Sequence, residues 1–279
     1  SSLSPFFCSN IMTIPGRHFL RNLVERRALV AQLVRRDFQQ RYVGSAAGWM
    51  WGIVHPLVQL GIWYFVFQVC LGMMLPPDAP TQSYALFVMA GYLPWMLFQE
   101  TVTRSAGSLV DHAGLITKTV FPSEVVAVSV FLSSMIHHLI GVGLVMAASV
   151  IMTHSLSPLV VVLPVYMFFV GLLGVGIGWV ASSLHVYLRD TGQVLNVVMT
   201  VWLWMTPVMI SEDKIPADYR WVIRWNPMSF VVEAYRSRLL TAAWPDAGQL
   251  GIIAAYSVAV FVAGGFFFRH LKRGFADVL

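Results

Sequence analysis

Long stretches without any charged residue dominate the hydrophobic and polar pattern of the chain. They lie between Arg41 and Asp78, Asp78 and Glu100, Glu124 and Arg189, Asp190 and Glu212, and Asp246 and Arg269. Each exceeds the roughly 20 apolar residues that a helix needs to cross a bilayer. The longest holds two spans, because residues 153–158 have turn composition. The pattern therefore predicts six spans, at about 50–75, 84–104, 124–152, 159–184, 191–210 and 250–268.

The apolar runs are continuous and do not alternate with period two, which favours membrane helices over a β-barrel. Composition supports this prediction. The chain is 57% hydrophobic and 11% charged, with a mean hydropathy of +0.70, whereas an average soluble domain is about 25% charged. The expected fold class is an all-α integral membrane protein.

Basic residues indicate the orientation of the spans. They cluster before the first span and after the last, and the loops after spans two and four carry Arg104, Lys118 and Arg189. The short loops after spans one and three carry none. The positive-inside rule then places both termini in the cytoplasm. Residues 211–249, the external segment, lie outside the cell in this orientation, although they contain several arginines.

Residues 19–45 precede the first span and predict a basic amphipathic helix. Apolar residues recur at helical spacing, and arginines and glutamines occupy the other face. Such a helix lies in the membrane interface, either as a simple anchor or as a docking surface for a cytoplasmic partner. The chain then divides into an N-terminal tail (1–18), the interface helix (19–45) and a six-span domain (46–279).

The sequence RDFQQRYVGSAAGWMWGIVHPL at residues 36–57 resembles the start of the membrane subunits of ABC exporters for polysaccharides and polyol phosphates. It supplies Arg36-Asp37, Arg41-Tyr42, Gly48, Trp51 and Pro56-Leu57, and departs at Ala47, where that family usually has leucine. LITKTVFP (115–122), RWNPMSFVVEAYRSRLL (224–240) and FADVL (275–279) also resemble segments of this family. The resemblance covers roughly residue 20 to the end and runs in the family's order.

This resemblance implies a complex of two membrane subunits and two ATPase subunits. The chain contains no G-x-x-x-x-G-K-[ST] phosphate loop, so we expect no cofactor in this chain, with ATP and Mg bound by the partner. Two cytoplasmic segments, 106–121 and 185–193, are candidates for contact with the ATPase; as an alternative they are ordinary connectors. The candidate coupling residues are Asp111, Leu115, Lys118, Arg189 and Asp190.

The external segment is too polar to span and unusually aromatic. Pro227 divides it, because proline disfavours helix in the preceding residue. We expect two short helices that dip into the outer leaflet as a re-entrant gate; the alternative is an interfacial pair that only holds the loop. The gate candidates are Tyr219, Trp221, Trp225, Asn226 and Pro227.

A sugar polymer slides best along flat apolar faces with sparse hydrogen-bond partners, which Trp and Tyr provide. Trp49, Trp51 and Trp244 fit interfacial belts. Residues deeper in the spans are conduit candidates: Trp63, Tyr64, Tyr92, Trp95, Trp202 and Trp204. Arginines hold phosphates through paired hydrogen bonds. For the undecaprenyl diphosphate carrier that the resemblance implies, the candidates are Arg36 and Arg41 inside and Arg220, Arg224, Arg236 and Arg238 outside.

Three further patterns receive structural interpretations. His137 and His138 diverge by about 100° around a helix and do not converge on one metal ion. Glu100 and Arg104, at i and i+4, form a helical ion pair. Small residues in 171–179 predict close helix packing, within the chain or across a dimer.

The predicted function is export of a lipid-linked polysaccharide, most consistent with O-antigen, across the bacterial inner membrane by a homodimer with ATPase partners. A teichoic acid or capsule exporter and a small-molecule efflux permease remain alternatives. A membrane enzyme that modifies lipid-linked sugars is disfavoured, because such an enzyme needs a carboxylate or His cluster at a membrane face. We expect no metal site and no nucleic-acid partner.

Overall fold

The computed structural model describes residues 26–41, 44–75, 83–118, 121–153, 157–209, 215–241 and 243–278. The described residues form helices and connecting turns, and none of them is in a strand. The predicted N-terminal tail and the start of the interface helix, residues 19–25, lie outside the described residues, as do residues 211–214 of the external segment.

Helices occur in every stretch predicted to span the membrane. In chain order they are α3 (Trp51–Trp63) continued by the π-helix η2 (Tyr64–Cys70), α4 (Tyr84–Asp111), α6 (Glu124–Thr153), η3 (Pro158–Val162) leading into α7 (Leu163–Tyr187), α8 (Thr191–Trp204) and α11 (Ala247–Leu271). Among the described residues four segments are long and apolar enough to cross a membrane: Trp51–Cys70, Glu124–Met152, Pro158–Tyr187 and Ala247–Gly274. The structure thus has four candidate spans where the sequence predicts six.

The remaining two predicted spans, α4 and α8, differ from the other four for separate reasons. α4 has 28 residues but carries Glu100 and Arg104 in its second half. α8 has only 14 residues, about 21 Å at 1.5 Å per residue. The prediction that this helix continues to residue 210 is wrong. Pro207 disfavours helix at Thr206, whose hydroxyl donates to the Trp202 carbonyl as the helix ends.

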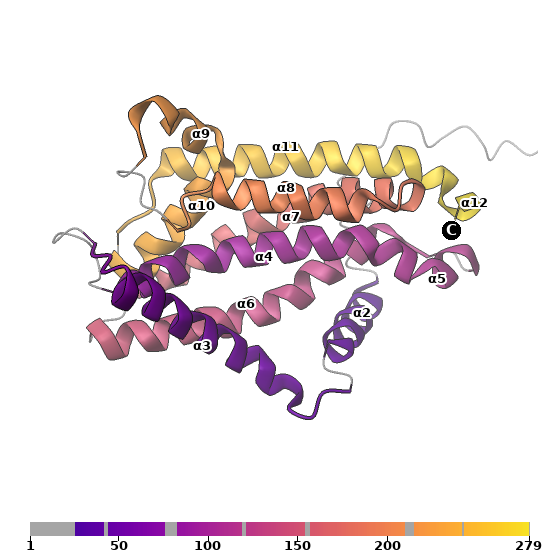
Figure 1. Ribbon diagram of the computed structural model, residues 1–279. Helices are drawn as coiled ribbons and strands as arrows, with labels where there is room; N and C mark the ends of the chain where they lie inside the picture. Colours follow the sequence, from indigo (N-terminus) through magenta and orange to yellow (C-terminus); the bar gives the residue numbers. More distant parts are fainter. Residues whose placement is uncertain are drawn as a thin grey trace, which may run out of the picture.

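α4, α7 and α11 form the centre of the bundle: α7 packs against both α4 and α11, and α6 packs against α4. Large side chains fill the interfaces, with Trp95, Tyr84, Tyr166 and Phe98 fully buried. Figure 1 shows α9 (Arg220–Trp225) and α10 (Pro227–Arg236) at one end of this bundle. The small helices α5 (Ala113–Lys118) and α12 (Phe275–Val278) lie at the other end. Elements assigned to opposite sides of the membrane therefore lie at opposite ends.

The small residues of 171–179 bring α7 into backbone contact with α11. A Cβ added to Gly264 would collide with the carbonyl group of Gly176, and one added to Gly176 would lie 2.7 Å from the Val260 carbonyl oxygen. Gly178 lies close to the side chain of Ser105 on α4, where an added Cβ would be 2.8 Å from the Ser105 Cβ. The predicted close packing is confirmed, and among the described residues these contacts are made within the chain.

The amphipathic helix before the first span is α2 (Arg27–Gln40). It packs against α6, with Val30 and Leu33 buried beside Val125. The following turn reaches η1 (Gly48–Met50) through Gly44 and Gly48, both at positive φ, which glycine adopts without steric cost. α2 is therefore packed on the bundle by its apolar side.

Candidate functional site

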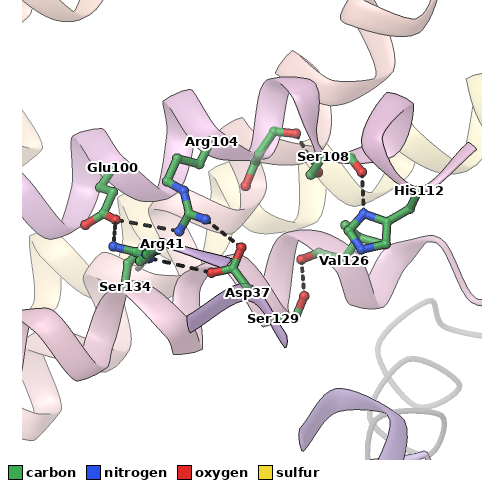
Figure 2. A network of polar contacts seen from close by, with 10 residues as sticks. Asp37, Arg41, Glu100, Arg104, Ser108, His112, Val126, Ser129 and Ser134 are labelled. Atoms are coloured by element: carbon green, nitrogen blue, oxygen red, sulfur yellow. Dashed lines mark hydrogen bonds and ion pairs between the residues drawn. The ribbon is translucent and has the colours of Figure 1, made fainter. Parts of the chain in front are cut away.

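Four charged residues join α2 to the neighbouring end of α4. Figure 2 shows Asp37 of α2, and Arg41, which is the C-cap residue of that helix, beside Glu100 and Arg104 of α4. Arg104 Nη2 lies 2.5 Å from Asp37 Oδ1 and its Nη1 lies 3.6 Å from Glu100 Oε1. Arg41 pairs with Glu100, and its Nε lies 3.8 Å from Asp37 Oδ2. We call these residues the four-charge network.

The network also reaches α6, because Arg41 Nη2 donates a hydrogen bond of 3.1 Å to the Ser134 hydroxyl. Burial raises the pKa of the Asp37 carboxyl, but the hydrogen bond and charge of Arg104, with the charge of Arg41, outweigh this, so the pKa lies below its ordinary value. Asp37 therefore stays ionised at neutral pH and keeps α2 tied to α4.

Replacing Asp37 by Asn, Arg104 by Gln, or both, tests this connection. These side chains are 21% and 32% exposed, so we expect each single change to cost about 1–2 kcal/mol of stability, between the values for surface and buried pairs. The double variant should cost less than the sum of the two single variants. Thermal unfolding in detergent measures these costs. Arg36→Gln changes an exposed neighbouring residue, so its stability cost should simply add to that of Asp37→Asn. If the costs of Asp37→Asn and Arg104→Gln add in the same way, the four-charge network does not couple the two helices.

At the other end of the bundle, Asn226 connects α8 to the two helices of the external segment, α9 (Arg220–Trp225) and α10 (Pro227–Arg236). Its Oδ1 accepts hydrogen bonds from Trp202 Nε1 (2.9 Å) and from the Met228 amide (3.0 Å). Its Nδ2 donates to the Thr206 hydroxyl (2.8 Å) and the Met205 carbonyl (3.3 Å). Asn226 thus caps α10, with Pro227 at the first helical position.

The aromatic gate candidates lie on the outer side of this junction. Tyr219, Trp221 and Trp225 are exposed, whereas Asn226 is buried. A groove of about 510 Å³ runs between α8 and α9 and is lined by Trp202, Trp221 and Trp225 together with valines of α8. The sequence prediction of two short helices with a break before Pro227 agrees with α9 and α10.

The four external arginines separate into two groups. Arg220 and Arg224 lie on α9, and Arg224 is exposed. Arg236 and Arg238 are 4% and 3% exposed, so their guanidinium groups are buried in this structure and are not presented at the surface where the sequence predicts diphosphate binding. Arg236 donates to the carbonyls of Phe87 and Val208, and Arg238 donates to the Ser237 hydroxyl, 2.7 Å away. Arg236 thus connects α10 to distant parts of the fold, whereas the hydrogen bonds of Arg238 are local.

α10 is also held by a buried hydrogen-bond chain. His138 Nδ1 lies 3.2 Å from the Leu93 carbonyl oxygen, and His138 Nε2 lies 3.0 Å from the Tyr235 hydroxyl. A carbonyl can only accept, so Nδ1 carries the proton and Tyr235 donates to Nε2. His138 therefore has a structural role, as expected, and no group of three possible metal ligands occurs in the described part of the chain.

The conduit candidates do not share one surface. Trp95 is completely buried against Phe98 and Trp202, so it offers no face to a polymer in this protomer. Trp63 packs edge to face on Tyr92, with ring centroids 4.8 Å apart. Tyr64 and Trp204 are exposed. The structure thus brings together two pairs, Trp95 with Trp202 and Trp63 with Tyr92.

The first candidate segment for contact with the ATPase, residues 106–121, contains a shorter separate helix than the sequence predicts. α4 continues through Asp111, so residues 106–111 belong to it, and the separate helix is α5. His112 is the C-cap residue of α4, and its Nδ1 lies 2.8 Å from the Ser108 carbonyl oxygen. Leu115 is exposed, the side chain of Lys118 lies outside the described residues, and Arg189 and Asp190 are exposed between α7 and α8. Leu115, Arg189 and Asp190 are therefore accessible to a partner, whereas Ala106, Ser108 and Leu109 of the first segment are buried in the bundle.

The sequence did not predict the four-charge network that contains Asp37, Glu100 and Arg104. Spacing indicated only the pair of Glu100 and Arg104, because Asp37 lies 67 residues away from Arg104. One usable signal was present: an ionisable residue at the end of a predicted span calls for a partner. Arg36, by contrast, is exposed on α2 and takes no part in the network.

Comparison with known proteins identifies relatives along most of the chain. Residues 28–240 match the model of the family described as ABC-2 type transporter. The O-antigen export system permease protein RfbA of Klebsiella pneumoniae is 26% identical over 90% of this chain and 95% of its own length. The protein of the same name from Myxococcus xanthus is 25% identical over 92% of this chain and 98% of its own. The polysialic acid transport protein KpsM of Escherichia coli is 22% identical over 86% of this chain and 92% of its own.

Proposed function

Since the chain belongs to the ABC-2 type transporter family, we propose that it is the membrane subunit of an exporter that moves lipid-linked polysaccharide, with undecaprenyl-diphosphate-linked O-antigen as the substrate. The observation that carries this substrate is the match to proteins named O-antigen export permeases, which extends over 90–92% of the chain. In this proposal the chain transports and does not catalyse, and the energy comes from ATP and Mg bound by a separate subunit.

The proposed topology has six spans, with α4 and α8 crossing the bacterial inner membrane beside the four most apolar segments. Both termini lie in the cytoplasm, which places the four-charge network, α5 and α12 at that side. α9 and α10 then form a re-entrant gate at the outer side. The separation of these elements to opposite ends of the bundle supports this arrangement.

The proposed complex contains two copies of the chain and two ATPase subunits. α5 and the connector at residues 188–190 are the proposed contacts for the ATPase, because both are exposed at the same end as α2. Movement of the partner would reach the bundle by two routes. One passes from α5 into α4, and the other passes from α2 through the four-charge network.

Export by this chain is tested by deleting its gene and measuring surface and cytoplasmic polysaccharide separately. We expect surface polymer to disappear and lipid-linked polymer to accumulate inside, and its chemical analysis would identify the substrate. Normal surface polymer would overturn the polysaccharide proposal and favour small-molecule efflux. Accumulation of a capsular polymer would favour the capsule alternative, which the relationship to the polysialic acid transporter supports.

The exposed tryptophans of α9 provide a test of the gate. Changing both Trp221 and Trp225 to Ala removes the two largest aromatic faces of the groove between α8 and α9. Stacking on such faces is worth about 1 kcal/mol each, so we expect export to fall several-fold while the amount of protein in the membrane stays constant. Surface polysaccharide per unit of protein is the measurement. Trp244→Ala, at another exposed position, is the control, and equal export by all variants would rule out a role for the α9 tryptophans.

A further inference from the structure

A cavity of about 480 Å³ lies between α3, α4 and α6. The α4 residues that line it extend from Met89 to Arg104, roughly 22 Å along the helix at 1.5 Å per residue. α3 forms the third wall with Trp51, His55 and Pro56. Figure 1 shows that α3 is inclined to α4, with its N-terminal end turned away from it. The cavity is therefore elongated along the direction of the bundle.

One end of the cavity is charged. Arg41, Glu100 and Arg104 line it, whereas Asp37 of the same network does not. Two of the charges that line the cavity are positive and one is negative, and the Asp37 carboxylate that pairs with both arginines lies just outside the lining. Arg41 Nε and Arg104 Nη1 are buried and make no hydrogen bond to any described residue. Their carboxylate neighbours lie beyond hydrogen-bond distance, 3.8 Å from Arg41 Nε to Asp37 Oδ2 and 3.6 Å from Arg104 Nη1 to Glu100 Oε1, so a hydrogen bond to a closer anion would be favourable for both N–H groups.

The other end of the cavity is mainly apolar, although His138 of α6 also lines the cavity beside Leu93. Met89, Leu93, Met96 and Leu97 line it from α4, and Gly141 lines it from α6. Methionine side chains are flexible and adapt to irregular apolar partners. The lining therefore changes along its length from guanidinium groups to methionine and leucine, as expected for a ligand with a small anionic head and a hydrocarbon tail.

We propose that this cavity is a binding site for a membrane phospholipid, with the phosphodiester between Arg41 and Arg104 and an acyl chain along Met89, Leu93 and Met96. Guanidinium groups pair well with phosphate oxygens. Because Asp37 and Glu100 already balance the charges of the two arginines, a phosphodiester with one negative charge fits this end better than a diphosphate, which carries more. The level of the head group agrees with Trp51, because tryptophan is enriched at the membrane interface.

The phospholipid would join α2, α3, α4 and α6 at the point where the four-charge network lies. It would accept hydrogen bonds from Arg41 Nε and Arg104 Nη1, which make none to the described residues, and it would fill the space left by the inclination of α3. The inference uses the proposed membrane orientation but does not depend on which polymer is exported.

Native mass spectrometry of the full chain, released from nanodiscs that contain phosphatidylglycerol, phosphatidylethanolamine and diacylglycerol, tests the site. We expect wild-type protein to retain a single phospholipid and no diacylglycerol. Met96→Trp places bulk in the apolar end and should lower phospholipid retention about tenfold, a change of roughly 1.4 kcal/mol. Met152→Trp makes the same substitution at an exposed position of α6 and should retain lipid like wild type.

His55→Trp provides a second filling variant at an exposed lining position, in case Met96→Trp does not fold, and we expect it to lower retention as well. Equal retention by wild type and the filled variants that fold would overturn the proposal, as would binding of diacylglycerol at the same level as phospholipid. A separate arm adds polyprenyl diphosphate to the nanodisc, and its displacement of the phospholipid would overturn the phosphodiester assignment. Because lipid mass is measured, failure here is distinct from failure of the export assay.

Discussion

Gly264→Leu should prevent the accumulation of folded protein in the membrane. A side chain at Gly264 meets the backbone of Gly176 on α7, and not a side chain that can rotate away. α7 and α11 would have to separate, and α7 is also packed against α4. Overpacking that the backbone cannot relieve costs about 3 kcal/mol or more, a large part of the stability of a typical domain.

Fluorescence-detected size-exclusion chromatography of a tagged protein measures this effect. Gly251→Leu is the matched control, because it lies on the same helix and a Cβ there meets no atom within 4 Å. Gly264→Ala should give an intermediate result, since its single methyl group already collides with Gly176. A monodisperse Gly264→Leu protein with a wild-type melting temperature would show that the two helices do not need this close approach.

Arg236→Ala should produce a comparably large loss of stability. The guanidinium group lies inside the bundle, where it donates to the carbonyl oxygens of Phe87 (3.2 Å) and Val208 (2.6 Å). Its Cζ also lies 3.7 Å from the centroid of the Phe87 ring. Gly91 leaves room for it, because a Cβ there would be 2.8 Å from Arg236 Nη2. Alanine would leave two buried acceptors and a cavity, which together cost on the order of 3–5 kcal/mol.

The expected readout is a lower melting temperature in detergent and little protein in the membrane. Arg224→Ala removes an arginine of the same external segment from an exposed position, so its stability should equal that of wild type. Arg236→Lys should recover part of the loss, because an ammonium group can reach one carbonyl but does not match the planar contact with Phe87. Wild-type stability of Arg236→Ala would mean that α10 is held by its other contacts, including the hydrogen bond between Tyr235 and His138.

The apolar segments were predictable because each consists of consecutive residues in the sequence. The gap between Glu124 and Arg189 predicted α6 and α7, and residues 153–158 predicted the turn between them. The helix break at Pro227 followed from local sterics in the same way. The end of α8 was missed, although Pro207 was visible, because an apolar run extends past it.

The side-chain partners could not be predicted from local spacing. Arg236 follows the aromatic external segment, and nothing in its neighbours indicates that it turns inward to residues 149 and 28 positions away. The small residues of α7 did predict close packing, but Gly264 is only one of several glycines and alanines on α11, so the sequence does not single it out as the matching position. Which helices meet is decided by the tertiary arrangement, and a single sequence does not record it.

The attachment of α2 has a consequence for how the protein is made. Its partners all come later in the chain: Glu100 and Arg104, the α6 residue Val125, and Ser134, which accepts a hydrogen bond from Arg41. A ribosome that has synthesised only α2 and α3 has produced a helix with no place to bind. The surface on which α2 packs becomes complete only after α6 has been inserted, so nascent chains acquire this part of their structure late in biogenesis. Assembly with an ATPase through α2 would therefore follow membrane integration of the first half of the protein.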